Sequence, residues 1–328
     1  MEAIAVREPT DVAVARRRVG RLTERLGYDE TAAGRVAIVV TELAQNLLRH
    51  AGGGEILAGA DVHRAGGIEI LALDRGPGMA DVAACLRDGY STGGTSGNGL
   101  GAVKRLAHQM LFHTAPQKGT AVLVRIGGEA DFDGANVRNT AVLCIPQTGE
   151  TVCGDTAAIV TRPDGIVGVL LADGLGHGPL AAAASGEAAK LFLKHAATSP
   201  KDILATLHAG LRATRGAAVA TALINPESKR VAYGGIGNIA GFITDTGGVR
   251  RMVSHSGTAG HTAGRFQDFH YPLHTNPVLV MYSDGLATSW SPESHAGLFS
   301  LDPLLIAGVL YRDHARGRDD ASVVVWKG

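Results

Sequence analysis

A polar, glycine-rich stretch without hydrophobic periodicity, at residues 128–139, separates two halves of this 328-residue chain. The half before it is predicted to form helix, helix, strand, strand, loop, helix and strand, whereas strands far outnumber helices in the half after it. A chain of this length is long enough for two domains of ordinary size. The sequence therefore predicts an α/β (α+β) protein with domains at 1–127 and 140–328 and a linker at 128–139, the second domain being a layered sandwich.

The front domain is predicted to begin with two amphipathic helices. Apolar residues recur at helical spacing over residues 10–26. Asp29 can cap a second helix that runs to about His50 and stops at the glycines of 52–54. The next predicted elements are a strand hairpin at 55–62 and 68–74, a helix at 100–110 and a closing strand at 119–126.

The back domain is predicted to consist of short strands around two longer helices. The helices are expected at 179–197, which is rich in alanine, and at 200–214. The predicted strands are 140–146, 156–161, 165–173, 220–225, 230–237, 239–244, 277–285 and 321–327.

Composition excludes several classes of protein. Basic and acidic residues balance at 31 each, so no basic excess points to nucleic acid. The three cysteines, Cys85, Cys144 and Cys153, match neither a disulfide framework nor a zinc site, and we expect reduced thiols in a cytoplasmic protein. No apolar run is long enough to cross a bilayer, and the N-terminus lacks the apolar core of a signal peptide. We therefore expect neither nucleic acid nor membrane as a partner.

Three polar side chains, Glu42, Asn46 and His50, recur at four-residue intervals in the second predicted helix, so they share one of its faces. Such a face is often simply solvated. Asp74 stands at the end of a predicted strand and is followed by Gly76 and Gly78. This pattern is typical of an ordinary turn, but it also suits an acidic side chain that binds the amino group of a purine beside bare backbone.

Residues 88–106 hold six glycines and then continue as a helix-like run. Bare backbone before a helix suits an anion, because the helix N-terminus presents unpaired N–H groups and glycine lets a phosphate approach closely. In a chain with 45 glycines, a surface loop is an equally ordinary explanation. The order of all the motifs along the chain decides between the two.

That order resembles the GHKL family of ATPases, which fold as an α/β sandwich around a Bergerat-type ATP site. Within that family the chain looks like the RsbT serine kinases of bacterial stress signalling. The segments that carry the resemblance are "TELAQNLLRHAGGGEI", "DRGPGM", "DGYSTGG", "GLGAVKRL" and "KGTAVLV". The resemblance covers residues 11–126 and implies protein serine/threonine kinase activity with ATP and Mg²⁺.

The resemblance also implies a role for each matching residue. Asn46 would supply an amide oxygen to the Mg²⁺ ion, and Glu42 would be the base that deprotonates the incoming hydroxyl group. Asp74 would bind the adenine amino group. The remaining implied contacts are space for adenine at Gly76 and Gly78, a phosphate-binding lid at Gly97, Gly99 and Gly101, and a water-bridged adenine contact at Thr120.

Aspartates recur at the edges of apolar strands in the back domain. They are Asp155, Asp173, Asp284 and the neighbours Asp319 and Asp320. Each one alone is an ordinary turn signal. Together they fit another explanation, because hard divalent cations prefer several carboxylates held on rigid strands, with water completing the coordination. Two such ions can activate a water molecule for in-line attack on phosphorus.

The set resembles the metal-dependent PPM phosphatases, which fold as an α-β-β-α sandwich, and most closely their SpoIIE-type bacterial branch and RsbX. The matching segments are, in order, "GETVCGD", "LLADGLGHGPLAAAAS", "ATALIN", "GGIGN", "YSDGL" and "RDDASVVV". The resemblance covers residues 140–327. It implies protein serine/threonine phosphatase activity that depends on two Mn²⁺ or Mg²⁺ ions.

This second resemblance implies a set of metal ligands. Asp173 would bridge both ions, and the Gly174 carbonyl would bind one of them. Asp155 would join the second metal, while Asp284 and Asp319 would hold the first. Asp319 is preferred to its neighbour because the family pattern places the ligand first and a polar partner second.

Two features of the predicted phosphatase site stay open. His177 is either a hydrogen-bond donor or acid near the metal ions or a turn residue at the start of a helix. The arginine with which eukaryotic relatives bind phosphate has no clear counterpart in the sequence.

Together the two resemblances predict a bifunctional signalling enzyme. The front domain would phosphorylate a serine or threonine of a STAS-domain partner, and the back domain would remove that phosphate, with other stress-switch proteins as further partners. Fusion keeps the product near the second site. Two alternatives stay open: the front domain is an ATP-dependent partner-binding module and only the phosphatase is catalytic, or the phosphatase domain is vestigial.

Overall fold

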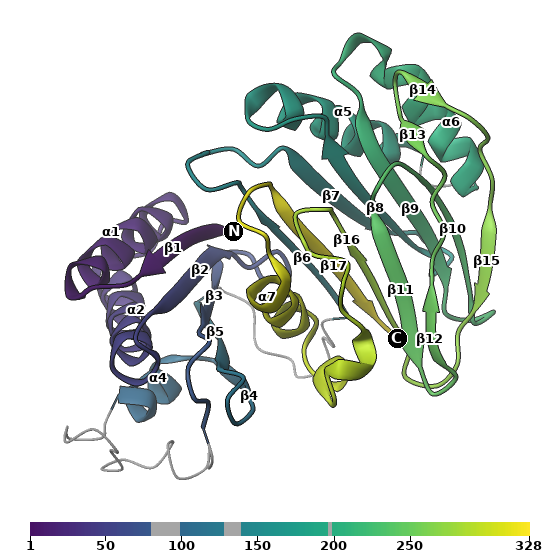
Figure 1. Cartoon of the computed structure of the whole chain (residues 1–328). Helices are drawn as coiled ribbons and strands as arrows, with labels where there is room; N and C mark the ends of the chain where they lie inside the picture. The colour runs from purple at the N-terminus through teal and green to yellow at the C-terminus, as the bar shows by residue number, and fades with distance from the viewer. Residues whose placement is uncertain (80–98, 128–138, 196–198) are drawn as a thin grey trace. The chain divides into compact units, whose positions relative to one another are not determined.

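The computed structural model describes residues 1–79, 99–127, 139–195 and 199–328. The chain forms two compact units, Met1–Arg138 and Asn139–Gly328 (Figure 1). Some predictions fall outside the described residues, namely Cys85, Gly97, linker residues 128–138 and the last two residues of the helix expected at 179–197. In the described ranges, no helix combines the length and the hydrophobicity needed to cross a bilayer.

A five-stranded antiparallel sheet forms the centre of the first unit. Its elements are β1 (Glu2–Val6), α1 (Pro9–Arg25), α2 (Glu30–Ala51), β2 (Gly54–Ala60), β3 (Gly67–Leu73), α4 (Gly99–Leu106), β4 (Gln109–Thr114) and β5 (Thr120–Gly127). The strand order is β1-β2-β3-β5-β4. Helices α1 and α2 lie side by side on one face of this sheet, and α4 packs against α2 (Figure 1).

Helix α2 carries the predicted kinase residues, and the local sequence defines both of its ends. The Asp29 side chain caps it by accepting a hydrogen bond from the Ala32 backbone N–H at 2.7 Å. Gly52 ends it in the left-handed conformation, with φ of 70°, which glycine adopts without strain. Its apolar stripe, which includes Val40 and Leu43, is buried in the core of the unit. The predicted cap and stop are confirmed.

Pattern reasoning misses both edge strands of this sheet. β1 pairs with β2, with Ile4 opposite Ile56, and β4 pairs with β5. The helix expected at 100–110 is wrong at its C-terminal end, because α4 stops at Leu106 and β4 begins at Gln109. Pairing with β5 gives these residues a ladder of hydrogen bonds, and this tertiary context outweighs their local helix propensity.

Two five-stranded antiparallel sheets form the second unit. The first has the order β15-β10-β9-β8-β7, and the second has the order β12-β11-β16-β17-β6. The strands are β6 (Thr140–Ile145), β7 (Asp155–Thr161), β8 (Val167–Gly174), β9 (Ala217–Asn225), β10 (Arg230–Ile236), β11 (Ala240–Asp245), β12 (Gly248–Arg251), β15 (Phe269–Pro272), β16 (Val278–Tyr282) and β17 (Ala321–Lys327), with a short hairpin of β13 (Gly257–Thr258) and β14 (Thr262–Ala263). The helices are α5 (Pro179–His195), α6 (Pro200–Gly210) and α7 (Pro303–His314).

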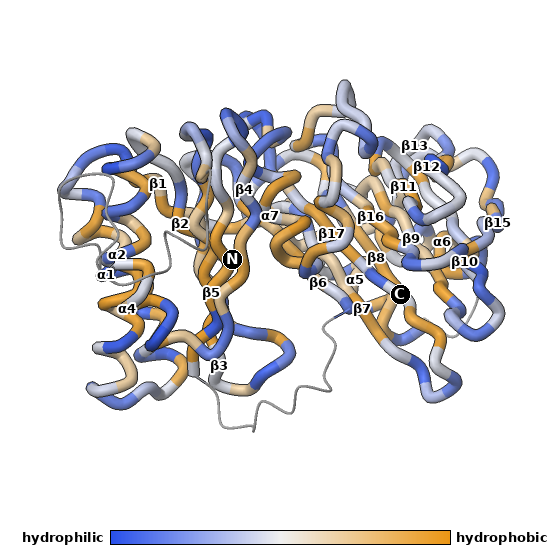
Figure 2. The backbone as a smooth tube through the Cα atoms, turned by 90° about the horizontal axis from the view of Figure 1, so that it is seen from below, coloured by the Kyte–Doolittle hydropathy of each residue, from blue (hydrophilic) through white to orange (hydrophobic). Residues whose placement is uncertain are grey.

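Helices cover the outer faces of these two sheets. α5 and α6 pack on the first sheet, and α7 packs on the second. The core between the sheets holds Tyr233, Met281 and Trp326, all buried, and Figure 2 shows apolar residues along β8, β16 and β17. The unit is therefore an α-β-β-α sandwich, and the predicted α/β (α+β) two-domain fold class is confirmed.

Helix α7 is absent from the sequence-based prediction, although its start carries recognisable signals. The Asp302 side chain caps it by accepting a hydrogen bond from the Leu304 N–H at 2.9 Å, and Pro303 occupies its first turn. Almost every residue of α7 is buried. A helix buried all round lacks the polar face that periodicity detects. The structure also adds the short strands β12 to β15.

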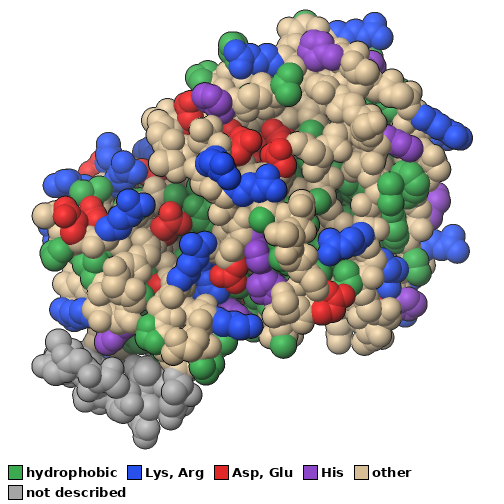
Figure 3. All heavy atoms as spheres, viewed as in Figure 1, with side chains coloured by type: hydrophobic (Ala, Val, Ile, Leu, Met, Phe, Trp, Pro, Cys, Tyr) green, Lys and Arg blue, Asp and Glu red, His purple; other side chains and the backbone are tan. Residues whose placement is uncertain are grey.

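Charged side chains of both signs are interspersed on the face shown in Figure 3. This distribution agrees with the equal counts of basic and acidic residues. Any electrostatic contribution to function therefore comes from local clusters of charged side chains rather than from a broad surface potential of one sign.

Candidate active sites

The first predicted site forms where α2 meets the first turn of α4. Gly99 lies so close to α2 that a Cβ added to it would be 2.7 Å from Glu42 Oε2 and 3.8 Å from Asn46 Oδ1. Gly101 is buried slightly further along α4. The amide Nδ2 of Asn46 is buried and has no hydrogen-bond partner within the described part of the chain. The structure thus brings the predicted base and the predicted metal-binding amide to the N-terminus of a helix.

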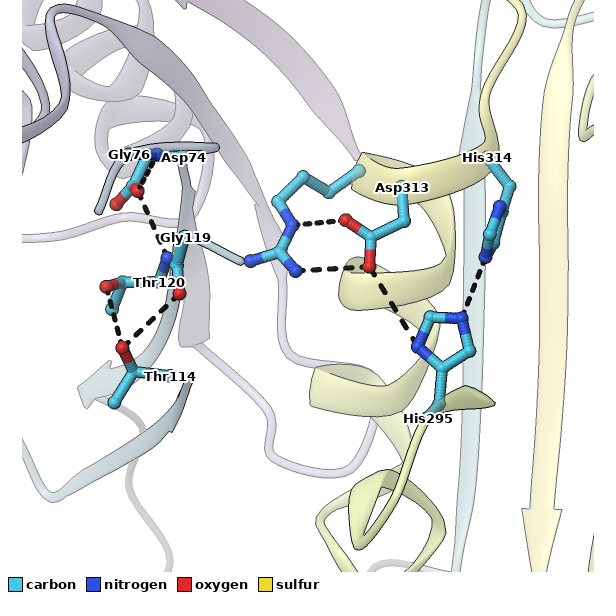
Figure 4. A network of polar contacts seen from close by, with 9 residues as sticks. Asp74, Gly76, Thr114, Gly119, Thr120, His295, Asp313 and His314 are labelled. Carbon is cyan, nitrogen blue, oxygen red and sulfur yellow. Dashed lines mark hydrogen bonds and ion pairs between the residues drawn. The ribbon is translucent and has the colours of Figure 1, made fainter. Parts of the chain in front are cut away.

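Asp74 follows β3 and is held by two backbone groups (Figure 4). Its Oδ1 accepts hydrogen bonds from the Gly76 N–H at 2.8 Å and from the Thr120 N–H at 3.0 Å. Among the described residues nothing donates to Oδ2. A carboxylate oriented in this way, with one oxygen free, can accept a hydrogen bond from an exocyclic amino group.

Glycine is sterically required after Asp74. At Gly76 a Cβ would lie 2.6 Å from the Cβ of Ala51. At Gly78 φ is +74°, and a Cβ would lie 2.3 Å from the Ala115 carbonyl oxygen. At both positions the backbone therefore approaches a neighbouring segment so closely that no residue with a Cβ atom would fit.

Thr114 is a functional candidate that the sequence reasoning missed. Its Oγ1 accepts a hydrogen bond from the Met79 N–H at 2.8 Å and lies 3.1 Å from Thr120 Oγ1 and 3.3 Å from the Gly119 carbonyl oxygen (Figure 4). It therefore links the turn after Asp74 to the start of β5, where Thr120 is 95% buried. Only the pairing of β4 with β5 could have revealed it.

The residues of this site fit ATP with Mg²⁺. The unpartnered Nδ2 of Asn46 is a donor for a phosphate oxygen, while its Oδ1 is an oxygen ligand of the kind that Mg²⁺ prefers. The free oxygen of Asp74 suits the adenine amino group. The N-terminus of α4 supplies backbone N–H groups and the positive end of a helix dipole for phosphate.

We expect Gly78→Ala to weaken ATP binding roughly tenfold or more, because its Cβ would collide with the Ala115 carbonyl oxygen and relief of that clash and of the strain at positive φ would move the turn after Asp74. Titration calorimetry with ATP and Mg²⁺ measures the effect. The control is Gly34→Ala in α2, where a Cβ meets nothing within 4 Å. That variant should keep its ATP affinity and gain roughly 0.5–1 kcal/mol of unfolding free energy. Equal ATP affinity in both variants would contradict the assignment.

The second predicted site forms at the ends of β7, β8, β16 and β17. Asp155 and Asp173 are direct cross-strand partners of β7 and β8, so two acidic side chains lie opposite each other. Asp284 follows β16, and Asp319 precedes the adjacent strand β17. Like charges placed directly opposite each other in a sheet repel. A cation bound between these carboxylates would remove the repulsion.

The pKa of Asp173 responds to the charges of the other three carboxyl groups. Burial, followed by the charges of Asp155, Asp284 and Asp319, raises the pKa of Asp173 to about 9. The pKa of Asp284 is raised mainly by burial and, to a smaller extent, by the charge of Asp319, while the charge of Arg316 lowers it in part. The four groups therefore share one electrostatic site.

Asp155 is the most deeply buried of the four. Burial raises its pKa to about 6, although the nearby hydroxyl groups of Ser283 and Ser322 lower it in part. Neither of its carboxylate oxygens has a hydrogen bond within normal distance in the described structure. Buried carboxylate oxygens without partners are costly unless a charge of opposite sign binds them.

The donor set of this site fits hard divalent cations. The candidate ligands are all oxygens, as Mg²⁺ and Mn²⁺ prefer, and both oxygens of Asp155 are free to bind. Within the four described ranges, no three acidic, histidine or cysteine side chains already converge on a single metal position. The fit therefore rests on donor chemistry and on the unpartnered oxygens. Asp155, Asp173, Asp284, Asp319 and the Gly174 carbonyl stay the predicted ligands.

Asp320, by contrast, has both of its carboxylate oxygens occupied. Oδ1 accepts a hydrogen bond from the Gln147 N–H at 2.8 Å, and Oδ2 accepts one from the Gly154 N–H at 2.9 Å. Its side chain is 98% buried. Asp320 thus holds the segment that leads into Asp155. This supports the preference for Asp319 as the ligand and gives Asp320 a positioning role that the sequence did not reveal.

Two further polar pairs surround the site. Asn238 donates from Nδ2 to Asp284 Oδ2 at 2.7 Å, which orients a predicted ligand and was missed by the sequence reasoning. His177 Nδ1 lies 2.7 Å from Glu150 Oε1, and its side chain is 57% exposed. His177 thus lies just before α5 with an acidic partner, and both interpretations of it stay open.

We expect Asp320→Asn to weaken Mn²⁺ binding by about 10- to 100-fold, as loss of a residue that orients metal ligands typically does. The amide nitrogen would face the N–H of Gln147 or Gly154, so one of the two hydrogen bonds is lost. Titration calorimetry with Mn²⁺ measures the effect, and Asp164→Asn in the exposed β7–β8 turn is the control. Unchanged Mn²⁺ affinity in Asp320→Asn would remove the positioning role.

Comparison with known proteins finds relatives for both halves of the chain. The histidine kinase-like ATPase domain family matches residues 5–126. The family described as stage II sporulation protein E (SpoIIE) matches residues 163–326, half of the chain. Serine/threonine-protein kinase RsbT of Bacillus subtilis (strain 168) is 35% identical over 111 residues, which cover 33% of this chain and 84% of that kinase.

Solved structures share the fold of more than half of the chain. One, described as "The bacterial stressosome: a modular system that has been adapted to control secondary messenger signaling", superposes with a TM-score of 0.54 at 23% identity and covers 57% of this chain and 97% of its own. Another, RsbX in complex with magnesium, gives a TM-score of 0.50 at 20% identity over 57% of this chain and 94% of its own. At these identities the likeness establishes the fold.

Fold and sites together define a GHKL-type, histidine kinase-like ATPase domain joined to a PPM-type phosphatase-fold domain. The chain belongs to the SpoIIE family, and its front half is a relative of the RsbT serine/threonine kinases. The resemblances drawn from the motifs are confirmed for both halves.

Proposed function

We propose that this chain is a bifunctional switch in partner-switching signalling. Its first unit transfers the γ-phosphate of ATP to a serine or threonine of a STAS-domain partner, and its second unit removes that phosphate. The observation that carries the proposal is that one chain holds two separate clusters of the residue types that phosphoryl transfer needs. Glu42 and Asn46 lie at the first residue of α4, and Asp155 lies opposite Asp173 in the second unit.

In the first unit each residue acts on a different part of the reaction. Glu42 accepts the proton of the incoming hydroxyl group, which makes the oxygen nucleophilic. Asn46 would hold the Mg²⁺ ion, which would neutralise charge on the phosphates, and Asp74 would orient the adenine. The backbone N–H groups at the start of α4 stabilise the charge that develops on the transferred phosphoryl group.

In the second unit the carboxylates do the work of positioning. Asp155, Asp173, Asp284 and Asp319 would hold two divalent cations at the end of the sandwich. When bound, these cations lower the pKa of a water molecule and neutralise charge on the phosphate. Asn238 and Asp320 keep the carboxylates in place through the hydrogen bonds described above.

A STAS-domain protein is the proposed partner because of the relatives of the first unit. The matched relative is a serine/threonine-protein kinase, and the RsbT family acts in stress signalling. Fusion of the two units raises the effective concentration of the phosphorylated product at the second site. Control by the partner then decides which activity dominates.

The test uses the Asp173→Asn chain, in which the second site is disabled. This chain is incubated with ATP, Mg²⁺ and each STAS-domain protein of the source organism, and intact masses are followed. The proposal predicts that one partner gains a phosphoryl group. Tight ATP binding without phosphorylation of any STAS protein would instead support an ATP-dependent partner-binding module in which only the phosphatase is catalytic.

A further inference from the structure

The turn after Asp173 is fastened to the segment that precedes β9. The Leu175 N–H donates to the Gly216 carbonyl oxygen at 3.0 Å, and Gly174 pairs with Ala217 in the ladder between β8 and β9. These bonds fix the backbone next to Arg215 against the turn that carries the predicted bridging ligand. The fold therefore places the backbone of Arg215 close to this turn.

The guanidinium group of Arg215 lies over Gly176 in this turn. Gly176 has φ of +91°, and a Cβ added to it would lie 3.1 Å from Arg215 Nη1, with no other heavy atom within 4 Å. Gly176 is three residues from Asp173, a separation that spans at most about 11 Å even in a fully extended chain. The cationic group therefore lies against the turn that follows the predicted bridging ligand.

Arg215 has no partner of its own among the described residues. Other arginines of the second unit bind carboxylates, as Arg162 does with Asp164 and Arg250 with Asp245. No such ion pair or hydrogen bond involves the Arg215 side chain within the described ranges, and the residue is exposed. The guanidinium group presents a planar set of N–H donors, and without an acceptor in the protein it can donate two hydrogen bonds to a phosphate group.

The other cationic candidates near the site already have acidic neighbours. The backbone N–H of Arg316 donates to the Gly285 carbonyl oxygen at 2.8 Å, and the charge of its side chain lowers the pKa of Asp284 in part. His177 is paired with Glu150, whose negative charge disfavours a phosphate dianion. Arg215 differs from both, because no carboxylate is paired with it within the described ranges.

We propose that Arg215 binds the phosphate monoester of the phosphoserine or phosphothreonine substrate in the second unit. Nothing in the motifs assigns this role, since the arginine of eukaryotic relatives has no counterpart in the sequence. The inference rests on the proposed phosphatase function and names the group that recognises its substrate. Gly176 leaves the space in which the guanidinium and the phosphate meet.

The test measures binding of inorganic phosphate to the full chain in Mn²⁺ by titration calorimetry, so that it does not depend on turnover. Arg215→Ala should weaken phosphate binding about 10- to 100-fold, because a charge-assisted hydrogen-bonded pair is lost. Arg215→Lys should restore part of it. The control is Arg212→Ala, a change of another exposed arginine three residues away, which should leave phosphate affinity unchanged.

A second arm follows hydrolysis of p-nitrophenyl phosphate. Arg215→Ala should raise KM more than it lowers kcat, since the proposed contact is with the bound phosphate. Circular dichroism confirms that each variant is folded. Wild-type hydrolysis with unchanged phosphate affinity and KM in Arg215→Ala would overturn the inference and leave the phosphatase function intact. Arg215-dependent phosphate binding without any hydrolysis would support the inference and count against the phosphatase function.

Discussion

Replacing Glu42 with glutamine is expected to slow phosphoryl transfer to the partner by roughly 10²- to 10⁴-fold, the usual contribution of a general base. The amide keeps the shape of the side chain but cannot take a proton from the incoming hydroxyl group. Glu42 lies against the first residue of α4, where the phosphates are expected. The rate is measured from the intact mass of the partner over time, in the Asp173→Asn background.

ATP affinity separates this catalytic role from a binding role. Glu42→Gln should bind ATP as tightly as the parent chain, because the assigned ATP contacts lie at Asn46, Asp74 and the backbone. Glu30→Gln, a change of an exposed glutamate in the first turn of the same helix, serves as the matched control and should keep full activity. A Glu42→Gln chain that phosphorylates its partner at the parent rate would remove the base from the account.

Replacing Asp173 with asparagine is expected to lower dephosphorylation by roughly 10²- to 10⁴-fold, because loss of a bridging carboxylate removes several kcal/mol of metal-assisted catalysis. The assay follows release of phosphate from the phosphorylated partner in Mn²⁺. Asp164→Asn in the exposed β7–β8 turn removes the same charge away from the site and should leave the rate unchanged.

The same substitution should have the opposite effect on the stability of the metal-free protein. The pKa of Asp173 is raised because burial and the charge of Asp155 disfavour its ionised form. The free energy of unfolding therefore falls as the pH rises from the pKa of an aspartate in the unfolded chain, about 3.9, towards the folded-state pKa of about 9. An uncharged asparagine avoids that cost. In a chelator at pH 7 the variant should therefore unfold at a higher temperature than the wild type. Equal midpoints would contradict the proposed charge repulsion.

Much of the fold could be predicted because local sequence and tertiary structure agree. The cap at Asp29 and the stop at Gly52 define α2. The apolar strands of the second unit could be predicted from their runs of apolar residues. The missed elements are those in which tertiary context decides. Strands β1 and β4 exist through pairing with β2 and β5, and α7 lacks a polar face because it is buried all round.

The sites divide in a similar way. Motifs could predict the residues to which chemistry is assigned, such as Glu42 and Asp173, because those residue types recur at recognisable positions. Residues that position them, such as Thr114 and Asp320, do so through contacts between segments far apart in the chain: Asp320 binds the N–H of Gly154, 166 residues away. No local pattern encodes such a contact. Arg215 likewise becomes visible only when the turn after Asp173 is seen beside it.

The measurement that tests the central claim most directly passes one partner through both sites. The STAS protein is phosphorylated by the Asp173→Asn chain, purified, and then incubated with the Glu42→Gln chain in Mn²⁺ without ATP. Tandem mass spectrometry locates the phosphoryl group before and after. The account predicts that the residue phosphorylated by the first unit is the one cleared by the second. A phosphoryl group that persists while the same chain hydrolyses p-nitrophenyl phosphate would show that the two sites serve different substrates and would contradict the switch.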